Sequence, residues 1–193
     1  MNQQVAVRGK KLFTYEDYLR LPDDGRRWEI IRGELLMAPS PIVVHQRILR
    51  NLGWVLVAYV EDRGIGEILY APMDVVLSQT DVVEPDILYI SRERNRIILE
   101  KNIWGAPDLI VEILSSSTKA RDRKAKWALY AEYGVREYWI VDPEARTVEV
   151  SALEEDEYRL YAQYEGEDVL TSPMFPDLEI ELTRVFASSN YAG

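Results

Sequence analysis

The chain has 193 residues, no cysteine and a single histidine. Without cysteine it can form no disulfide framework, thiol nucleophile, zinc ribbon or iron–sulfur cluster. One histidine also excludes zinc centres that use two or three histidine ligands. Any metal site in this protein must therefore be rich in oxygen ligands, which suit Mg²⁺ or Mn²⁺.

Glycine and proline are scarce, at 10 and 9 residues, which argues against a disordered or fibrous chain. The longest apolar stretch, residues 52–60, is too short to cross a bilayer. Residues 1–11 lack the apolar segment of a secretory signal. Because 47% of the residues are hydrophobic, which is enough to fill a core, we expect one domain over residues 1–193. We expect it in the cytoplasm, without a membrane partner.

The formal net charge of -10 is unevenly distributed. Residues 144–193 hold 12 of the 33 acidic residues but only 3 of the 23 basic ones. The rest of the chain is close to neutral, so the acidic composition argues only weakly against a polyanionic partner for that part.

Start and stop signals predict three helices. Thr14 to Asp17 resembles a capping box, and the short helix after it should end before Pro22. A second helix is predicted over residues 40–63, with Ser40 as its N-cap and Gly64 as its stop. A third is predicted over residues 119–133.

Apolar and β-branched runs predict the strands. They cover residues 28–37 as two strands turned at 32–33, then 67–77, 83–90, 108–115, 136–142, a hairpin of 147–153 with 157–164, and 177–182. Strands interrupted by a helix before a further strand predict an α/β fold, with a mixed central β-sheet flanked by helices.

Glu112 is the most informative residue, because it places a charge inside an apolar strand. A sheet tolerates such a charge when it has a partner. The alternative is an edge-strand glutamate that faces water.

A second carboxylate could come from any of four Pro-Asp pairs, and spacing separates them. Asp108 lies four residues before Glu112 on one strand, about 13 Å away at a rise of roughly 3.3 Å per residue. Two ligands of one cation must each approach to roughly 2.1 Å, so these two cannot readily share it. A neighbouring strand is only about 4.8 Å away, and Asp86 begins such a strand. Asp86 and Glu112 are therefore the candidate metal ligands.

Lys126 is the candidate cationic side chain. It lies on the same face of the predicted third helix as Leu129 and Tyr130, whereas Lys124 lies on the opposite face. A simple pair with Asp122 one turn earlier is an equally good interpretation.

Taken together, these motifs resemble the Uma-type restriction endonuclease domain family of bacteria, part of the PD-(D/E)xK nuclease superfamily. The matching segments are Pro85-Asp86, residues 106–115 with Glu112, residues 28–34, His45, residues 122–126 with Tyr130, and residues 134–143. The resemblance covers about residues 12–185. In the superfamily's simplest pattern the lysine stands two residues after the acid, where this chain has Leu114, and the resemblance implies that Lys126 replaces it.

The resemblance implies a restriction-endonuclease-like fold and a metal-dependent endonuclease that hydrolyses DNA. Asp86 and Glu112 would bind Mg²⁺ or Mn²⁺, and Lys126 would position the attacking water or stabilise charge on the phosphate. It also brings His45 near the site, although a buried histidine bonded to backbone is the more common situation. Glu34 either orients a second metal or water, or is an exposed residue beside a turn. Glu29 is a weaker candidate than Glu34 or His45.

Two further expectations follow from the resemblance. The protein is a possible homodimer. Its main alternative role is that of a catalytically idle, nuclease-like module that binds nucleic acid or a protein partner. Loop and helix bases that could contact phosphates are Arg92, Arg94, Arg96, Lys101, Arg121, Arg123 and Lys124, although a solvated surface is the commoner explanation for such residues.

Overall fold

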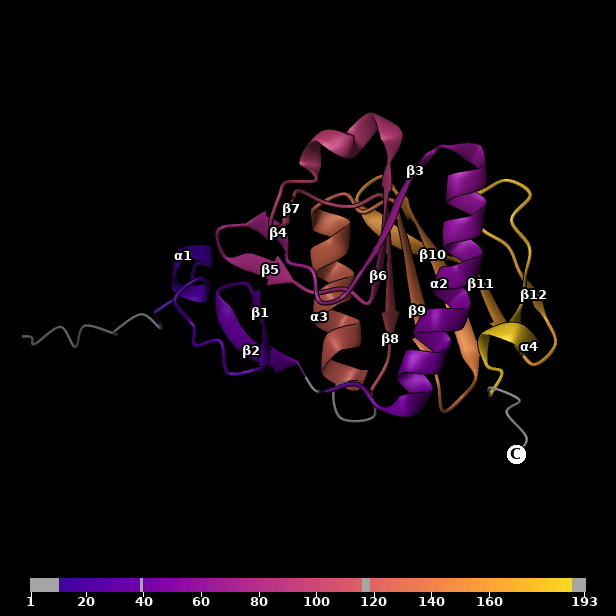
Figure 1. The fold of residues 1–193 in the computed structure, drawn as a ribbon, viewed down its shortest axis with the longest axis horizontal. Helices are drawn as coiled ribbons and strands as arrows, with labels where there is room; N and C mark the ends of the chain where they lie inside the picture. Colours follow the sequence, from indigo (N-terminus) through magenta and orange to yellow (C-terminus); the bar gives the residue numbers. More distant parts are fainter. Residues whose placement is uncertain (1–10, 39, 116–118, 189–193) are drawn as a thin grey trace, which may run out of the picture.

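The computed structural model describes residues 11–38, 40–115 and 119–188, with side chains from 119 to 122 left out. A six-stranded sheet forms the centre of the fold (Figure 1). Its order is β11 (Glu157–Glu165), β10 (Thr147–Glu154), β9 (Glu137–Asp142), β8 (Leu109–Ile113), β6 (Ile87–Ser91) and β3 (Gly66–Tyr70). The sheet is mixed, because β8 and β9 run parallel while the other pairs are antiparallel.

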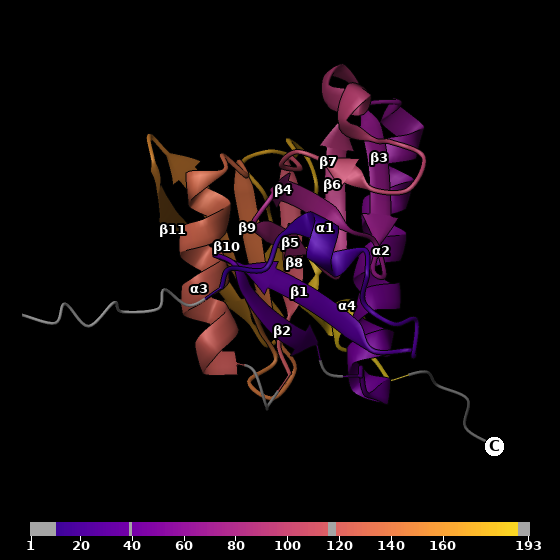
Figure 2. The ribbon, with the colours of Figure 1, turned by 90° about the vertical axis from the view of Figure 1, so that its left-hand side faces the viewer.

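A smaller sheet lies beside the central one and carries the N-terminal hairpin (Figure 2). Its order is β2 (Glu34–Ala38), β1 (Arg27–Ile31), β5 (Asp81–Val83), β4 (Val75–Ser78) and β7 (Ile103–Trp104). A two-stranded sheet of β12 (Val169–Leu170) and β13 (Ile180–Glu181) completes the strands of the described residues.

The helices cover both faces of the central sheet. They are α1 (Tyr15–Tyr18), α2 (Val43–Arg63), the 3₁₀ helix η1 (Arg92–Ile97), α3 (Lys119–Glu132) and α4 (Leu182–Val185). Alternate residues of a strand point to opposite faces. Ile87 and Tyr89 accordingly pack with α2 and the C-terminal segment, while Leu88 and Ile90 pack with α3 and the small sheet. Figure 1 shows α2 and α3 on opposite sides of the strands.

Several predicted features are confirmed. Thr14 and Asp17 form the capping box of α1. Gly64 ends α2 with a left-handed φ of 58°, a conformation that glycine adopts without steric cost. The third helix and the β10–β11 hairpin occupy nearly the predicted ranges. The α/β class with a mixed sheet flanked by helices is thus correct.

Three predictions about elements are wrong. Helix α2 begins at Val43 after an N-cap at Ile42, which has no side-chain cap, rather than after Ser40. The predicted strand 67–77 is two strands of different sheets, β3 and β4, with a cis Ala71–Pro72 bond between them. Likewise 83–90 divides between β5 and β6. A propensity pattern shows that residues are extended, but it does not show which sheet they join.

No helix within the described ranges is both long enough and apolar enough to cross a membrane.

Candidate active site

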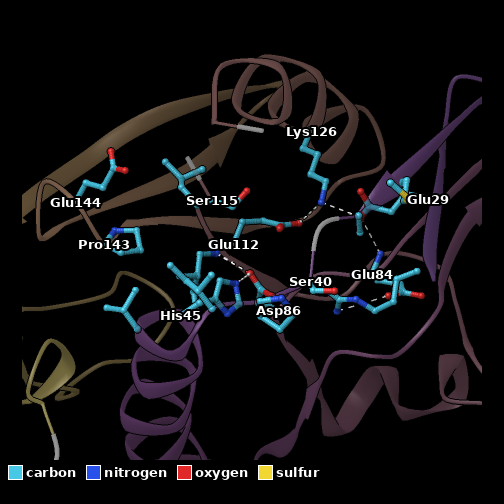
Figure 3. A pocket seen from close by; sticks show the side chains of 18 of the residues that line it. Glu29, Ser40, His45, Glu84, Asp86, Glu112, Ser115, Lys126, Pro143 and Glu144 are labelled. Carbon is cyan, nitrogen blue, oxygen red and sulfur yellow. Dashed lines mark hydrogen bonds and ion pairs between the residues drawn. The ribbon is translucent and has the colours of Figure 1, made fainter. Parts of the chain in front are cut away.

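A pocket of about 230 Å³ opens where the first turn of α2 meets the start of β6 and the end of β8. Asp86, Glu112 and Lys126, the three residues on which the predicted site depends, all line it, and so does His45 (Figure 3). Since one water takes about 30 Å³ in the liquid, the pocket has room for several water molecules or a small ligand.

Asp86 stands directly before β6, and its position follows from strand pairing. Ile87 is the register partner of Val111, so Asp86 lies beside the stretch of β8 that carries Glu112. Its Oδ2 accepts a hydrogen bond from the backbone N–H of Ile113 at 2.8 Å. The neighbouring strand's own backbone therefore holds the carboxylate in place.

Glu112 points from β8 towards α3. Its Oε1 accepts hydrogen bonds from the Lys126 ammonium at 3.0 Å and the Tyr130 hydroxyl at 2.7 Å. Lys126 and Tyr130 are one helical turn apart, so both face the strand. Burial raises the pKa of Glu112 to about 7, with Asp86 and Glu29 adding to the rise and Lys126 opposing it. The interpretation of Glu112 as a water-facing edge residue is wrong, because β8 is an interior strand.

Lys126 is only 4% exposed and lies between two carboxylates. Besides Glu112, its ammonium donates to Glu29 Oε1 at 2.8 Å. Burial disfavours the charge, but the two carboxylates outweigh that effect and raise the pKa of Lys126. The alternative interpretation pairs Lys126 with Asp122, whose side chain lies outside the part of the chain that the structure describes.

His45 is buried in the first turn of α2 and contacts a carboxylate rather than backbone. Its Nε2 lies 3.2 Å from Asp86 Oδ2. Its Nδ1 is buried without a hydrogen-bond partner among the described residues. His45 therefore belongs to the surroundings of Asp86, and together with the Ile113 amide it fixes that carboxylate.

Glu34 does not reach this group. It opens β2 as an exposed residue and is absent from the described residues that line the pocket. Of its two interpretations, the exposed residue beside a turn is the one that matches its placement. The structure therefore offers no support for a role of Glu34 in orienting a second metal or water.

Sequence reasoning gave little weight to Glu29 and none to Glu84, yet both line the pocket. The backbone N–H of Glu84 donates to Glu29 Oε1 at 3.0 Å. Burial raises the pKa of Glu84 to about 6, against the lowering effect of Arg27. In the sequence, Glu84 stands two residues before Asp86, and this spacing could have marked Glu84 as a candidate. No sequence pattern, however, places Glu84 or Asp86 next to β1, the strand that carries Glu29.

Within the described residues, no group of three or more acidic or histidine side chains is arranged as a complete metal-ligand set. Mg²⁺ needs no such set, because it usually keeps several waters and binds one or two carboxylates. Within the described ranges, the side-chain hydrogen bonds of Asp86 and Glu112 use one carboxylate oxygen each, Oδ2 and Oε1 respectively. Both residues line a pocket that also contains the carboxylates of Glu29 and Glu84, so the residues present fit a hard divalent cation.

Two of the basic residues considered for phosphate contacts have structural partners instead. Arg94 pairs with the fully buried Asp108 at 3.2 Å and also donates to the Ala106 carbonyl. Arg123 pairs with Glu149. These pairs explain the two arginines without a nucleic acid.

Comparison with known proteins identifies a matching family, a related protein and a solved structure of similar fold. Residues 15–183 match the model of the family Uma2, described as "Putative restriction endonuclease". The chain is 25% identical over 167 residues to the uncharacterized protein sll1609 of Synechocystis, covering 85% of this chain and 94% of that one. It superposes with a TM-score of 0.75 on a crystal structure from Anabaena variabilis titled as a "putative nuclease belonging to DUF820". That match has 22% identity and covers 90% of this chain and 97% of the other.

Proposed function

The chain belongs to the Uma2 family, and on that premise we propose that it is a metal-dependent endonuclease that hydrolyses DNA phosphodiester bonds. The observation that carries this proposal is the meeting of Asp86, Glu112 and Lys126 in one pocket. Two carboxylates can hold a hard cation, and a buried ammonium can stabilise charge on the phosphate, so together they can support phosphodiester hydrolysis.

Asp86 and Glu112 would hold Mg²⁺ or Mn²⁺ through Oδ1 and Oε2, the oxygens that accept no hydrogen bond from the described residues. Such an ion, when bound, supplies charge neutralisation at the scissile phosphate and acidifies a coordinated water. Lys126 uses two of its three N–H groups on Glu112 and Glu29, which leaves one to donate to a phosphate oxygen or to the attacking water. Water adds to phosphorus and releases a proton to solvent, while the bond from phosphorus to the sugar oxygen breaks and that oxygen takes up a proton from solvent.

The direct test is a cleavage assay on plasmid, linear duplex and single-stranded DNA, and on RNA, with Mg²⁺, Mn²⁺ or a chelator. We expect divalent-dependent cleavage of DNA that falls at least about 100-fold in Lys126→Met. The matched control is Lys11→Met, an exposed lysine before α1 that does not line the pocket, which should cut like the wild type. Circular dichroism verifies that both variants are folded, and the isosteric Asp86→Asn gives a second inactive variant.

Undiminished cleavage by a folded Lys126→Met protein would remove the lysine from the mechanism. If the wild type binds metal but cuts no nucleic acid in the panel, the chain is instead an idle nuclease-like module. The buried, mutually bonded arrangement of Glu112, Lys126 and Tyr130 favours the enzyme, because it keeps costly charges inside the protein.

A further inference from the structure

The buried ammonium of Lys126 has two carboxylate partners, and they come from different sheets. Glu112 belongs to β8 of the central sheet, while Glu29 belongs to β1 of the small sheet. The two hydrogen bonds, 3.0 Å to Glu112 and 2.8 Å to Glu29, are equally well made. One carboxylate would neutralise one ammonium, so the second calls for an explanation.

The two carboxylates differ in their surroundings. Glu112 is next in sequence to Ile113, whose amide binds Asp86, so it shares its side of the pocket with the other candidate ligand. Glu29 is bonded instead by the backbone N–H of Glu84 at 3.0 Å. Figure 3 shows the Lys126 ammonium between Glu112 and Glu29. A cation held by Asp86 and Glu112 would therefore have the ammonium between itself and Glu29.

Glu29 is also held rigidly. It is 6% exposed and lies in the middle of β1, which pairs with β2 along its whole length and also with β5. With the Glu84 amide fixing the same oxygen that receives Lys126, its carboxylate has little freedom to turn towards a cation.

We propose that Glu29 is a positioning residue for Lys126, an inference that rests on the function proposed above. Glu29 anchors the ammonium on the side of the small sheet and shares the neutralisation of its charge. Glu112 is thereby left able to bind a cation beside Asp86. Without Glu29, the ammonium has Glu112 as its sole carboxylate partner among the described residues, and it competes with the metal for that side chain.

A double-mutant cycle tests this assignment, because it separates a residue that acts through Lys126 from a direct metal ligand. Mn²⁺ binding is measured by titration calorimetry on the wild type, Glu29→Gln, Lys126→Met and the double variant. We expect Glu29→Gln to weaken Mn²⁺ binding at least about tenfold when Lys126 is present. In the Lys126→Met background, the same change should alter the affinity by no more than about threefold.

Cleavage kinetics supply the second measurement. Glu29→Gln should lower kcat with little change in KM for DNA, and the double variant should be no slower than Lys126→Met alone. Glu67→Gln, which removes an exposed carboxylate of β3, is the control that should change neither quantity. Where Glu29→Gln does not fold, Glu29→Asp carries the same cycle, since it keeps the charge but withdraws it from the ammonium.

An equal loss of Mn²⁺ affinity in both backgrounds would make Glu29 a metal ligand and overturn the proposal. Unchanged affinity and kcat in Glu29→Gln would overturn it as well. Failure of the proposed function looks different, because the wild type itself would then bind no Mn²⁺ or cut no DNA.

Discussion

The carboxylate of Asp86 accepts a hydrogen bond from the backbone N–H of Ile113 at 2.8 Å, across the boundary between two neighbouring strands. This bond fixes one candidate ligand against the strand that carries the other, Glu112. It uses main chain, so the placement of Asp86 depends on the sheet itself and not on a side chain that mutation could remove. The predictions below concern this pair and the residues around it.

Metal should stabilise the folded protein if Asp86 and Glu112 bind it. At a tenfold excess of free Mn²⁺ over its Kd, the free energy of unfolding should rise by about 1.4 kcal/mol. For a chain of this size that corresponds to an increase in Tm of about 3–6 °C. Differential scanning fluorimetry measures it, with Asp86→Asn as the variant that should show no shift. A wild-type Tm unaffected by millimolar Mn²⁺ or Mg²⁺ would contradict the metal site.

His45→Gln should weaken Mn²⁺ binding about tenfold, because the imidazole 3.2 Å from Asp86 Oδ2 orients that carboxylate. Titration calorimetry gives the affinity. Gln46→Ala, next to His45 but exposed, is the control and should bind like the wild type. An affinity unchanged in His45→Gln would show that the Ile113 amide alone suffices to hold Asp86.

Tyr130→Phe should lower Mn²⁺ affinity about tenfold, since it removes the 2.7 Å hydrogen bond that helps orient Glu112. The lost bond should also cost about 1 kcal/mol of stability. Tyr133→Phe is a matched control on the same helix, where the hydroxyl donates to Asp81 at 2.9 Å, away from the pocket. It should lose similar stability in urea unfolding but keep its metal affinity. Equal affinities in both variants would exclude Tyr130 from the site.

Asp108 should contribute stability that is lost in acid. Burial by itself would raise the pKa of Asp108, but the Ser91 amide and the Arg94 guanidinium outweigh it and lower the pKa below the ordinary 3.8. A carboxyl with a depressed folded-state pKa stabilises the fold above pH 3.8, and this contribution disappears as the pH falls through the folded-state pKa.

Urea unfolding of the wild type and Asp108→Asn over a range of pH checks this. Near neutral pH the variant should be less stable by about 3 kcal/mol, because Arg94 loses its buried partner. The difference should shrink in acid below the ordinary pKa of aspartate. A difference that is independent of pH would mean that the charge of Asp108 contributes nothing.

The choice among the four Pro-Asp pairs shows what strand geometry can predict from the sequence. A rise of about 3.3 Å per residue was enough to set Asp108 apart from Glu112, and the structure places Asp108 in an ion pair with Arg94 instead. Helical periodicity likewise placed Lys126 on the inward face of α3, where it is buried. Both conclusions depend only on the relative placement of residues that are close in sequence or lie on adjacent strands.

The wrong predictions concern segments in which tertiary packing overrides the local structural preference of the sequence. Ser40-Pro41 has the residue types of a helix start, yet this segment is the connection from β2 to α2 and lines the pocket. The apolar pattern of residues 67–77 gave no sign that the chain leaves one sheet for another. From the sequence, Glu34 was the stronger candidate and Glu29 the weaker one, but they lie on different strands of one hairpin, and Glu29 is the one bonded to Lys126.

The sequence by itself determined the kinds of chemistry available, since it offers no cysteine, one histidine and many carboxylates, and it indicated that Asp86, Glu112 and Lys126 belong together. The tertiary structure alone decided that Glu29, 97 residues before Lys126, completes the group, and that Glu34 does not. The physical reason is that local periodicity determines which way a side chain faces its own element, whereas the packing of the small sheet against α3 determines which distant carboxylate it meets.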